Sequence, residues 1–374
     1  MLLKNFPKRS IIKRKESLYS ENDEEFWEDP NMKKEIRVAM LGFGGIARSH
    51  KKAYGRLPSE ETGIHLVAMC DIDPEQFTKD IAINLGADQA AKEDTIHTYT
   101  DLDEMLAKED FEMIDICLPT YLHKEYTIRM LRAGKHVLCE KPMALSYEDC
   151  DEMIRVAKEE NRKLMVGQCL RFDLSYLYLK ECIDDGRFGA LKSVFMDRLS
   201  AHPTWGFENW FSDSSKSGGC LLDLHVHDID MVRFLLGEPK AVSGISYDGI
   251  SRWEMVNTRL FYDGVMVVAN GSWDESPSRG FEAVCRMTFE KAQIVLRGKK
   301  VTVYPNEGEA YDVEIPKCDY YAEEIRLFAN TIMDPSIKNE SNPPESARNT
   351  VALMNKLRES CDLGGQMLSF EAVK

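Results

Sequence analysis

Two patterns of apolar and polar positions divide the chain. From residue 35 to 166, short apolar runs rich in β-branched residues alternate with amphipathic stretches of helical length. Such alternation is typical of βαβ units that form a parallel sheet. We expect strands at 36–41, 66–70, 97–99, 113–118, 136–139 and 164–166, and helices at 46–54, 74–85, 102–107, 124–133 and 147–160. The first part therefore predicts a doubly wound, nucleotide-binding fold.

Beyond residue 167, strand-like runs follow one another directly. We expect strands at 191–199, 240–247, 257–262, 265–273, 281–289 and 292–296, a helix over 218–236 and a helix pair at 320–332 and 346–360. The expected fold is α/β: an N-terminal Rossmann doubly wound parallel sheet, then a C-terminal α+β domain with a large, mostly antiparallel sheet. The predicted domains are 35–166 and 167–374, and residues 1–34 form a charged extension that we expect to be poorly ordered.

Charge and composition exclude several classes of protein. The net charge of −15 repels nucleic acid, and neither a membrane-spanning apolar run nor the apolar core of a secretion signal is present. The ten cysteines stand singly, without a C-x-x-C pair. We therefore expect a soluble, cytoplasmic protein with reduced thiols, and no nucleic-acid or membrane partner.

A glycine-rich loop joins the first expected strand to the first helix. It reads Gly42, Phe43, Gly44, Gly45, Ile46 and Ala47, a G-x-G-x-x-A match in the position that a dinucleotide fingerprint requires. Gly42 permits the tight turn, Gly44 admits a pyrophosphate, and Ala47 lets the helix pack on the strand. The loop predicts a nicotinamide dinucleotide as cofactor.

Asp71 ends the second expected strand. A carboxylate there accepts hydrogen bonds from the adenosine ribose hydroxyls and repels a 2′-phosphate, which favours NAD and leaves NADP as the alternative. The gap between the glycine loop and Asp71 exceeds the typical spacing, and we attribute the excess to an inserted loop at 57–63. The other interpretation of Asp71 is a turn residue.

Three further motifs follow. The loop after the fourth strand holds Pro119, Thr120 and His123, and the loop after the fifth holds Glu140, Lys141 and Pro142. The expected helix over 218–236 opens with two glycines and carries Asp223 and His227 four residues apart, hence on one face.

These motifs resemble those of the Gfo/Idh/MocA family of oxidoreductases, and the likeness covers nearly everything from residue 36 onward. It implies that Pro119, Thr120 and His123 lie beside the nicotinamide ribose. It further implies that Glu140 contacts the cofactor, that Lys141 faces cofactor and substrate, often after a cis bond to proline, and that Lys141, Asp223 and His227 form the catalytic group. A homodimer or homotetramer through the outer face of the large sheet is also implied.

Several side chains allow two interpretations. Arg171 either contacts the cofactor or forms an interdomain ion pair, and the aromatic loop over 201–216 either stacks on a sugar or packs in the core. His225 stands where the family commonly has glycine, so it reshapes the pocket or adds a substrate contact. His225 and His227 point about 200° apart on a helix and cannot chelate one metal, and the other histidines show no ligand spacing. We therefore expect no metal.

The resulting hypothesis is an NAD(P)-dependent dehydrogenase acting on a CH–OH group of a sugar, polyol or sugar acid. In it His227 accepts the hydroxyl proton, Asp223 orients the imidazole of His227, and Lys141 stabilises the alkoxide. Two alternatives remain open: redox-neutral glycoside processing with a tightly held NAD, and a non-catalytic nucleotide sensor.

Overall fold

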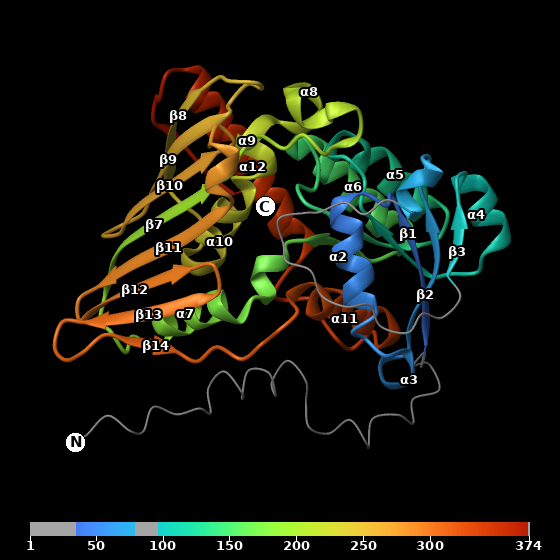
Figure 1. The fold of residues 1–374 in the computed structure, drawn as a ribbon, viewed down its shortest axis with the longest axis horizontal. Coiled ribbons are helices and arrows are strands. Elements are labelled where there is room, and N and C mark those ends of the chain that lie inside the picture. The colour runs from blue at the N-terminus through green and yellow to red at the C-terminus, as the bar shows by residue number, and fades with distance from the viewer. Residues whose placement is uncertain (1–34, 79–95, 373–374) are drawn as a thin grey trace.

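The structure, a computed structural model, describes residues 35–78 and 96–372 (Figure 1). The expected extension at 1–34 and most of the helix expected at 74–85 lie outside the described residues; of that helix, the structure describes a short 3₁₀ turn, η1 (Pro74–Phe77). None of the helices in the described ranges combines the length and apolar composition that a membrane span requires.

The first unit is a six-stranded sheet with the order β3-β2-β1-β4-β5-β6, and all its pairings are parallel. This confirms the expected doubly wound Rossmann sheet. Its elements are β1 (Ile36–Leu41), α2 (Gly45–Tyr54), α3 (Ser59–Thr62), β2 (Ile64–Cys70), β3 (His97–Tyr99), α4 (Leu102–Lys108), β4 (Met113–Ile116), α5 (Thr120–Arg132), β5 (His136–Glu140), α6 (Tyr147–Glu159) and β6 (Leu164–Gly167). The short helix α3 lies in the inserted loop expected at 57–63.

The second unit is a nine-stranded sheet with the order β14-β13-β12-β11-β7-β10-β9-β8-β15. Only β7 and β10 pair in parallel, so the sheet is mostly antiparallel, as expected. Its strands are β7 (Leu191–Leu199), β8 (Ala241–Tyr247), β9 (Met255–Phe261), β10 (Met266–Ser272), β11 (Glu282–Phe289), β12 (Ala292–Arg297), β13 (Lys300–Pro305), β14 (Tyr311–Val313) and β15 (Leu368–Ser369). The last three, β13 to β15, were not among the expected strands.

Helices cover one face of this sheet (Figure 1). Alternate residues of β9 and β10, such as Val256, Leu260 and Val267, point into a large apolar core shared with these helices. The other face carries exposed apolar side chains, among them Phe261 and Met266. The helical segments of this unit are η2 (Cys169–Phe172), α7 (Leu174–Asp184), η3 (Phe207–Ser212), α8 (Ser214–Ser217), α9 (Gly219–Asp223), α10 (Val226–Leu236), η4 (Pro277–Arg279) and α12 (Pro344–Asp362).

One late helix returns to the Rossmann sheet. Helix α11 (Tyr320–Met333) places Ile325 and Phe328 in the same apolar core as Ile36 and Val38 of β1. The first strands are apolar on both faces because helices from both ends of the chain cover them. Helix α12 lies against α6 and β8, and so joins the two units on the other side.

Candidate active site

The glycine loop has the geometry of a dinucleotide cradle. Gly42 has φ +85°, donates its N–H to Cys70 O at 2.8 Å, and would place a Cβ 2.8 Å from Cys117 O. Only glycine fits both requirements. A Cβ on Gly44 would meet no atom within 4 Å, and no side chain caps the N-terminus of α2. The N-terminus of α2 therefore offers both open space and uncapped backbone N–H groups, the two features that bind an anionic pyrophosphate.

The other residues of the glycine loop pack against the core and against Phe77. Phe43 stacks on Phe77 with ring centroids 5.6 Å apart, Gly45 and Ile46 open α2, and Ala47 is fully buried against the core under β1. The small side chain at Ala47 allows the close helix–strand packing that the fingerprint requires.

Asp71 is fixed beside this loop. Its Oδ2 accepts a hydrogen bond from the N–H of Phe43 at 2.6 Å, and its Oδ1 accepts one from the N–H of Asp73 at 2.8 Å. The two contacts hold the carboxylate at the tip of β2, next to the glycine loop. The contact with the Asp73 N–H is also the one that the turn interpretation of Asp71 predicts, and Asp73 in its turn accepts from the N–H of Glu75.

The loop after β4 is bound to the loop after β5 through His123. Its Nδ1 lies 2.8 Å from Pro142 O and its Nε2 lies 2.7 Å from Leu118 O. Pro119 and Thr120 form the start of α5, and Thr120 is buried. His123 is buried too, and burial lowers its pKa. The structure thus places His123 beneath the two loops, where it positions them.

Glu140 and Lys141 stand at the carboxyl end of β5. Glu140 Oε2 accepts the Lys141 N–H at 3.0 Å, and the bond from Lys141 to Pro142 is cis. Lys141 Nζ donates to Asp223 O at 2.9 Å and lies 3.4 Å from Asp223 Oδ1. The lysine of the first unit and the aspartate of the second thus meet, with both side chains only about 15% exposed.

The helix expected over 218–236 is two helices. Helix α9 ends at Asp223 and α10 begins at Val226, because the N–H of His225 donates to Cys220 O, one residue further back than in a regular α-helix. The expectation of one continuous helix was wrong at Leu224 and His225.

This break separates the roles of the two predicted catalytic residues. The Asp223 carboxylate contacts Lys141, and its pKa is raised by burial against the opposing effect of that lysine. Nδ1 of His227 is buried and has no hydrogen-bond partner among the described residues. The expectation that Asp223 hydrogen-bonds and orients His227 is therefore not met: Asp223 orients Lys141 instead. Burial, with the charges of Lys141 and Arg198, lowers the pKa of His227 well below its ordinary value, so the imidazole is neutral at pH 7.

His225 points away from this group, under the large sheet. It is fully buried, with Nε2 2.8 Å from Thr258 Oγ1, which itself donates to Ala269 O at 3.0 Å. Since the threonine hydroxyl has one proton, it must accept from the histidine N–H. The buried side chain of His225 therefore packs against β9 and β10.

Arg171 forms an ion pair, but with Asp230 of the same unit, whereas one of its two expected roles was an ion pair between the two units. Its Nε and Nη2 donate to the two carboxylate oxygens of Asp230 at 2.8 and 2.7 Å, and Nη1 donates to Ser341 O. Nη2 also donates to Ser346. The guanidinium nitrogens are thereby engaged inside the protein, so the geometry places Arg171 in a structural contact between η2, α10 and the start of α12.

The aromatic loop divides between the two interpretations. Trp210 and Phe211 are buried in a cluster with Trp273, and Tyr121 and Leu224 pack against it. Trp205 stands edge-on to Phe211 at 4.8 Å and Phe207 follows it, and these two rings remain 46% and 44% exposed. Because Tyr121 follows Thr120 and Leu224 follows Asp223, the loop is anchored next to both halves of the site.

Sequence comparison decides the family. A sequence model described as the oxidoreductase family with an NAD-binding Rossmann fold matches residues 36–168, and one for the GFO/IDH/MocA C-terminal domain matches residues 176–298, together more than half of the chain. The chain belongs to the Gfo/Idh/MocA family. Its Rossmann unit is accordingly an NAD-binding domain, and the cradle described above fits that cofactor.

Individual Gfo/Idh/MocA relatives differ in their chemistry. The chain is 30% identical over 291 residues to inositol 2-dehydrogenase of Rhizobium meliloti, covering 76% of this chain and 80% of that protein. It is 37% identical over 204 residues to 2,7-anhydro-N-acetylneuraminate hydratase of Mediterraneibacter gnavus, covering 54% of this chain and only 50% of the hydratase. Levoglucosan dehydrogenase in complex with NADH has the same fold, with a TM-score of 0.75 at 19% identity over 91% of this chain and all of that one.

Two features of this Gfo/Idh/MocA chain were missed from the sequence. Arg48 of α2 donates to Phe43 O, Gly44 O and Gln76 O, and so supports the glycine loop from behind. His50, which shows no ligand spacing in the sequence, lies in a buried cluster of acidic side chains. A basic residue four positions after a fingerprint glycine was the available signal for Arg48.

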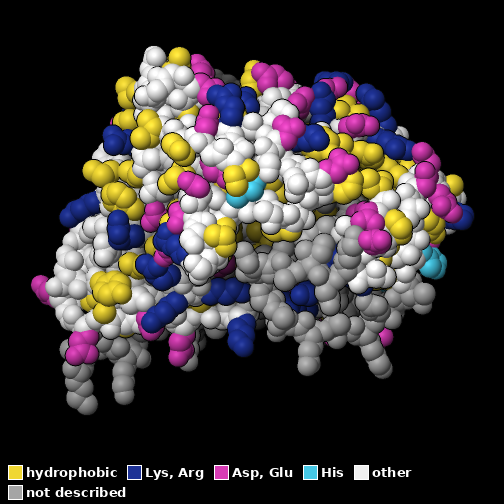
Figure 2. Space-filling model, turned by 45° about the horizontal axis from the view of Figure 1, so that its top comes forward, with side chains coloured by type: hydrophobic (Ala, Val, Ile, Leu, Met, Phe, Trp, Pro, Cys, Tyr) yellow, Lys and Arg dark blue, Asp and Glu magenta, His cyan; other side chains and the backbone are white. Residues whose placement is uncertain are grey.

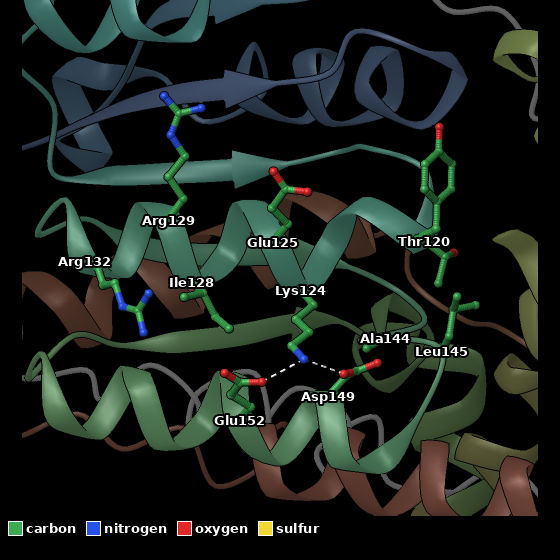
Figure 3. Close-up of a pocket in the computed structure, with 11 residues that line it drawn as sticks. Thr120, Lys124, Glu125, Ile128, Arg129, Arg132, Ala144, Leu145, Asp149 and Glu152 are labelled. Carbon is green, nitrogen blue, oxygen red and sulfur yellow. Dashed lines mark hydrogen bonds and ion pairs between the residues drawn. The ribbon is translucent and has the colours of Figure 1, made fainter.

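A separate groove of about 580 Å³ lies between α5 and α6 (Figure 3). At its centre Lys124 Nζ lies 2.6 Å from Asp149 and 2.7 Å from Glu152, so the charge of the lysine is neutralised within the groove. The lining residues include Thr120 and Tyr121 but not Lys141, Asp223 or His227. The groove is thus distinct from the candidate active site.

Proposed function

We propose that this protein oxidises a secondary hydroxyl of a cyclic polyol, sugar or sugar acid with NAD. The observation that carries the proposal is the contact between Lys141 and Asp223 beside a neutral His227, at the carboxyl ends of the strands that bind the dinucleotide. NAD, when bound, accepts a hydride from the substrate carbon.

The side chains of this chain then have defined tasks. The ammonium of Lys141, held by the carbonyl and carboxylate of Asp223, donates to the reacting oxygen and stabilises negative charge there. His227 accepts the hydroxyl proton, since a neutral imidazole has an unprotonated nitrogen. Asp223 acts through Lys141. Dinucleotide binding falls to the loop of Gly42 to Ala47 and to Asp71, whose carboxylate supports a preference for NAD over NADP.

A redox-neutral reaction is the second candidate, because one of the relatives reported above is a hydratase. We distinguish the two by absorbance at 340 nm, mixing the purified protein with NAD or NADP and a panel of inositols, aldoses, anhydrosugars and sugar acids. A rise with one substrate supports the dehydrogenase. Turnover of an anhydrosugar without net NADH, together with NAD that co-purifies, would favour the redox-neutral reaction.

We also propose that the protein works as a homodimer or homotetramer in the cytoplasm. The exposed apolar side chains on the outer face of the large sheet support self-association, and ten free cysteines, nine of them buried, agree with a reducing compartment. Acidic side chains lie among the basic ones over much of the face that Figure 2 shows, and this supports a partner other than nucleic acid.

A further inference from the structure

A buried charge cluster lies directly behind the site. His50 on α2 is fully buried, with Nδ1 2.8 Å from Asp115 Oδ2 on β4 and Nε2 2.9 Å from Glu140 Oε1 on β5. The helix whose N-terminus faces the pyrophosphate site is thereby joined to the strand that ends in Glu140 and Lys141. The proposed mechanism gives His50 no task.

The two contacts define the charge of His50. Carboxylate oxygens accept hydrogen bonds, so an imidazole that faces one at each nitrogen donates at both and is a cation. Burial, the largest single effect, lowers the pKa of His50, but the Asp115 carboxylate and Cys117 together outweigh it, and the pKa is raised well above its ordinary value. With both nitrogens donating, His50 has no lone pair for a metal ion.

None of the other polar groups described around His50 supplies a positive charge. Tyr54 donates to Asp115 Oδ2 at 3.1 Å, and the Cys117 thiol lies 3.8 Å from Nδ1. From α11, Tyr321 packs its ring 5.3 Å from the imidazole, and the Glu324 carboxyl lies within 4.8 Å. Both Glu324 oxygens are buried without a hydrogen-bond partner. Burial and the Glu140 charge raise the pKa of Glu324, and burial foremost raises the pKa of the nearby Cys169 thiol, so both shifts favour the neutral form.

Glu140 is the link from this cluster to the site. One oxygen contacts His50 and the other accepts the Lys141 N–H. A Cβ at Gly167 of β6 would lie 2.7 Å from Glu140 Oε1, so the fold leaves just enough room for this orientation. A carboxylate so enclosed stays ionised only while a cation compensates it.

We propose that His50 is a positioning residue: as a buried cation, it keeps Glu140 ionised and fixed in the orientation that binds the cofactor. The inference rests on the proposed function in one respect, the contact of Glu140 with NAD. With a neutral residue at position 50, Asp115 and Glu140 would share the buried space without a cation. The two carboxylates would then share a proton, so Glu140 would lose part of its charge, and NAD binding would weaken while Lys141, Asp223 and His227 remain in place.

The test is His50→Gln, which keeps a hydrogen-bond donor and removes the charge. We expect the Kd and the KM for NAD to rise about tenfold at pH 6.5 and to recover most of that loss by pH 9, where the buried carboxylate pair holds the extra proton less. The kcat at saturating NAD should stay within about threefold of the wild-type value. The control Tyr54→Phe removes the other donor to Asp115 and should leave NAD affinity unchanged.

A second variant keeps the test decisive if His50→Gln does not fold. His50→Gln combined with Asp115→Asn removes the competing carboxylate, so NAD affinity at pH 6.5 should return to near the wild-type value. An affinity in the double variant as poor as in the single one, or a single-variant loss that is equal at every pH, would overturn the inference. NAD binding is measured by fluorescence titration without substrate, so an absence of turnover on every substrate tested would count against the proposed function alone.

Discussion

Lys141 is the residue on which the proposed chemistry depends most directly. Lys141→Met removes the donor that faces the developing charge, and we expect kcat/KM to fall about 100- to 1000-fold while NAD binding is kept. Steady-state rates at 340 nm and an NAD titration measure the two effects. Lys124→Met is the matched control, because Lys124 is paired with Asp149 and Glu152 in the separate groove. Equal effects of the two variants would contradict the assignment.

The coenzyme preference belongs to Asp71. In Asp71→Asn the repulsion of a 2′-phosphate is lost, so the ratio of kcat/KM for NAD to that for NADP should fall about tenfold. Asp73→Asn changes the neighbouring carboxylate, which caps the following turn, and should leave the ratio unchanged. An equal change of the NAD-to-NADP ratio in both variants would contradict the assignment, because it would show that the loss of either nearby carboxylate alters coenzyme preference.

His225 makes stability depend on pH. Burial, followed by the charge of Arg198, lowers the pKa of His225 to about 3, whereas the unfolded chain titrates near 6.5. Because the unfolded state binds the extra proton first, the free energy of unfolding falls as the pH drops from about 6.5 towards 3. Between pH 6.5 and 4.5, the free energy of unfolding of His225→Gln should fall by about 2 to 3 kcal/mol less than that of the wild type. Urea unfolding at several pH values measures this free energy. If it depends on pH in the variant as it does in the wild type, His225 is not the cause of the pH dependence.

At the scale of elements, the aromatic loop combines an anchored base with an exposed edge. Phe211 is buried between Trp210 and Trp273, whereas half-exposed Trp205 stands edge-on to Phe211. We expect Trp205→Ala to raise the KM for a sugar-like substrate about five- to tenfold without changing the melting temperature, since it removes a stacking surface alone. Phe211→Ala should instead destabilise the fold by about 3 to 5 kcal/mol.

Kinetics and thermal melting of the two variants separate these roles. A loss of stability in Trp205→Ala, with the KM unchanged, would identify its ring as part of the packing.

At the scale of the whole molecule, the large sheet leaves one face open. Phe261 and Met266 are register partners on β9 and β10, and both are exposed on that face. Replacing both by glutamate should convert the proposed oligomer to a monomer without changing the circular dichroism spectrum, because buried like charges would oppose the association. Light scattering after size exclusion measures the mass. Ile72→Glu, an exposed apolar position of the Rossmann unit, is the control.

Local pattern was enough to predict the outline of this protein. The parallel sheet could be predicted because strands buried on both faces, such as β1 and β4, are mostly apolar, with a single charged residue in each, Arg37 and Asp115. The glycine loop and Asp71 could be predicted because their chemistry depends on backbone shape at a strand end, which neighbouring residues determine. Strands β14 and β15 escaped prediction because they are only three and two residues long and lie at the sheet edges, whereas β13, six residues long with alternating burial, was missed despite its pattern.

Partners far apart in the chain were decided by the tertiary structure alone. Lys141 and Asp223 are 82 residues apart, Arg171 and Asp230 are 59 apart, and His50 and Glu140 are 90 apart. The sequence determined which chemical groups were present and on which kind of element each stands. Packing determined which carboxylate faces which cation. The helix break after Asp223 turns the Asp223 side chain to Lys141 and the His225 side chain under the sheet. The local sequence pattern did not predict this break.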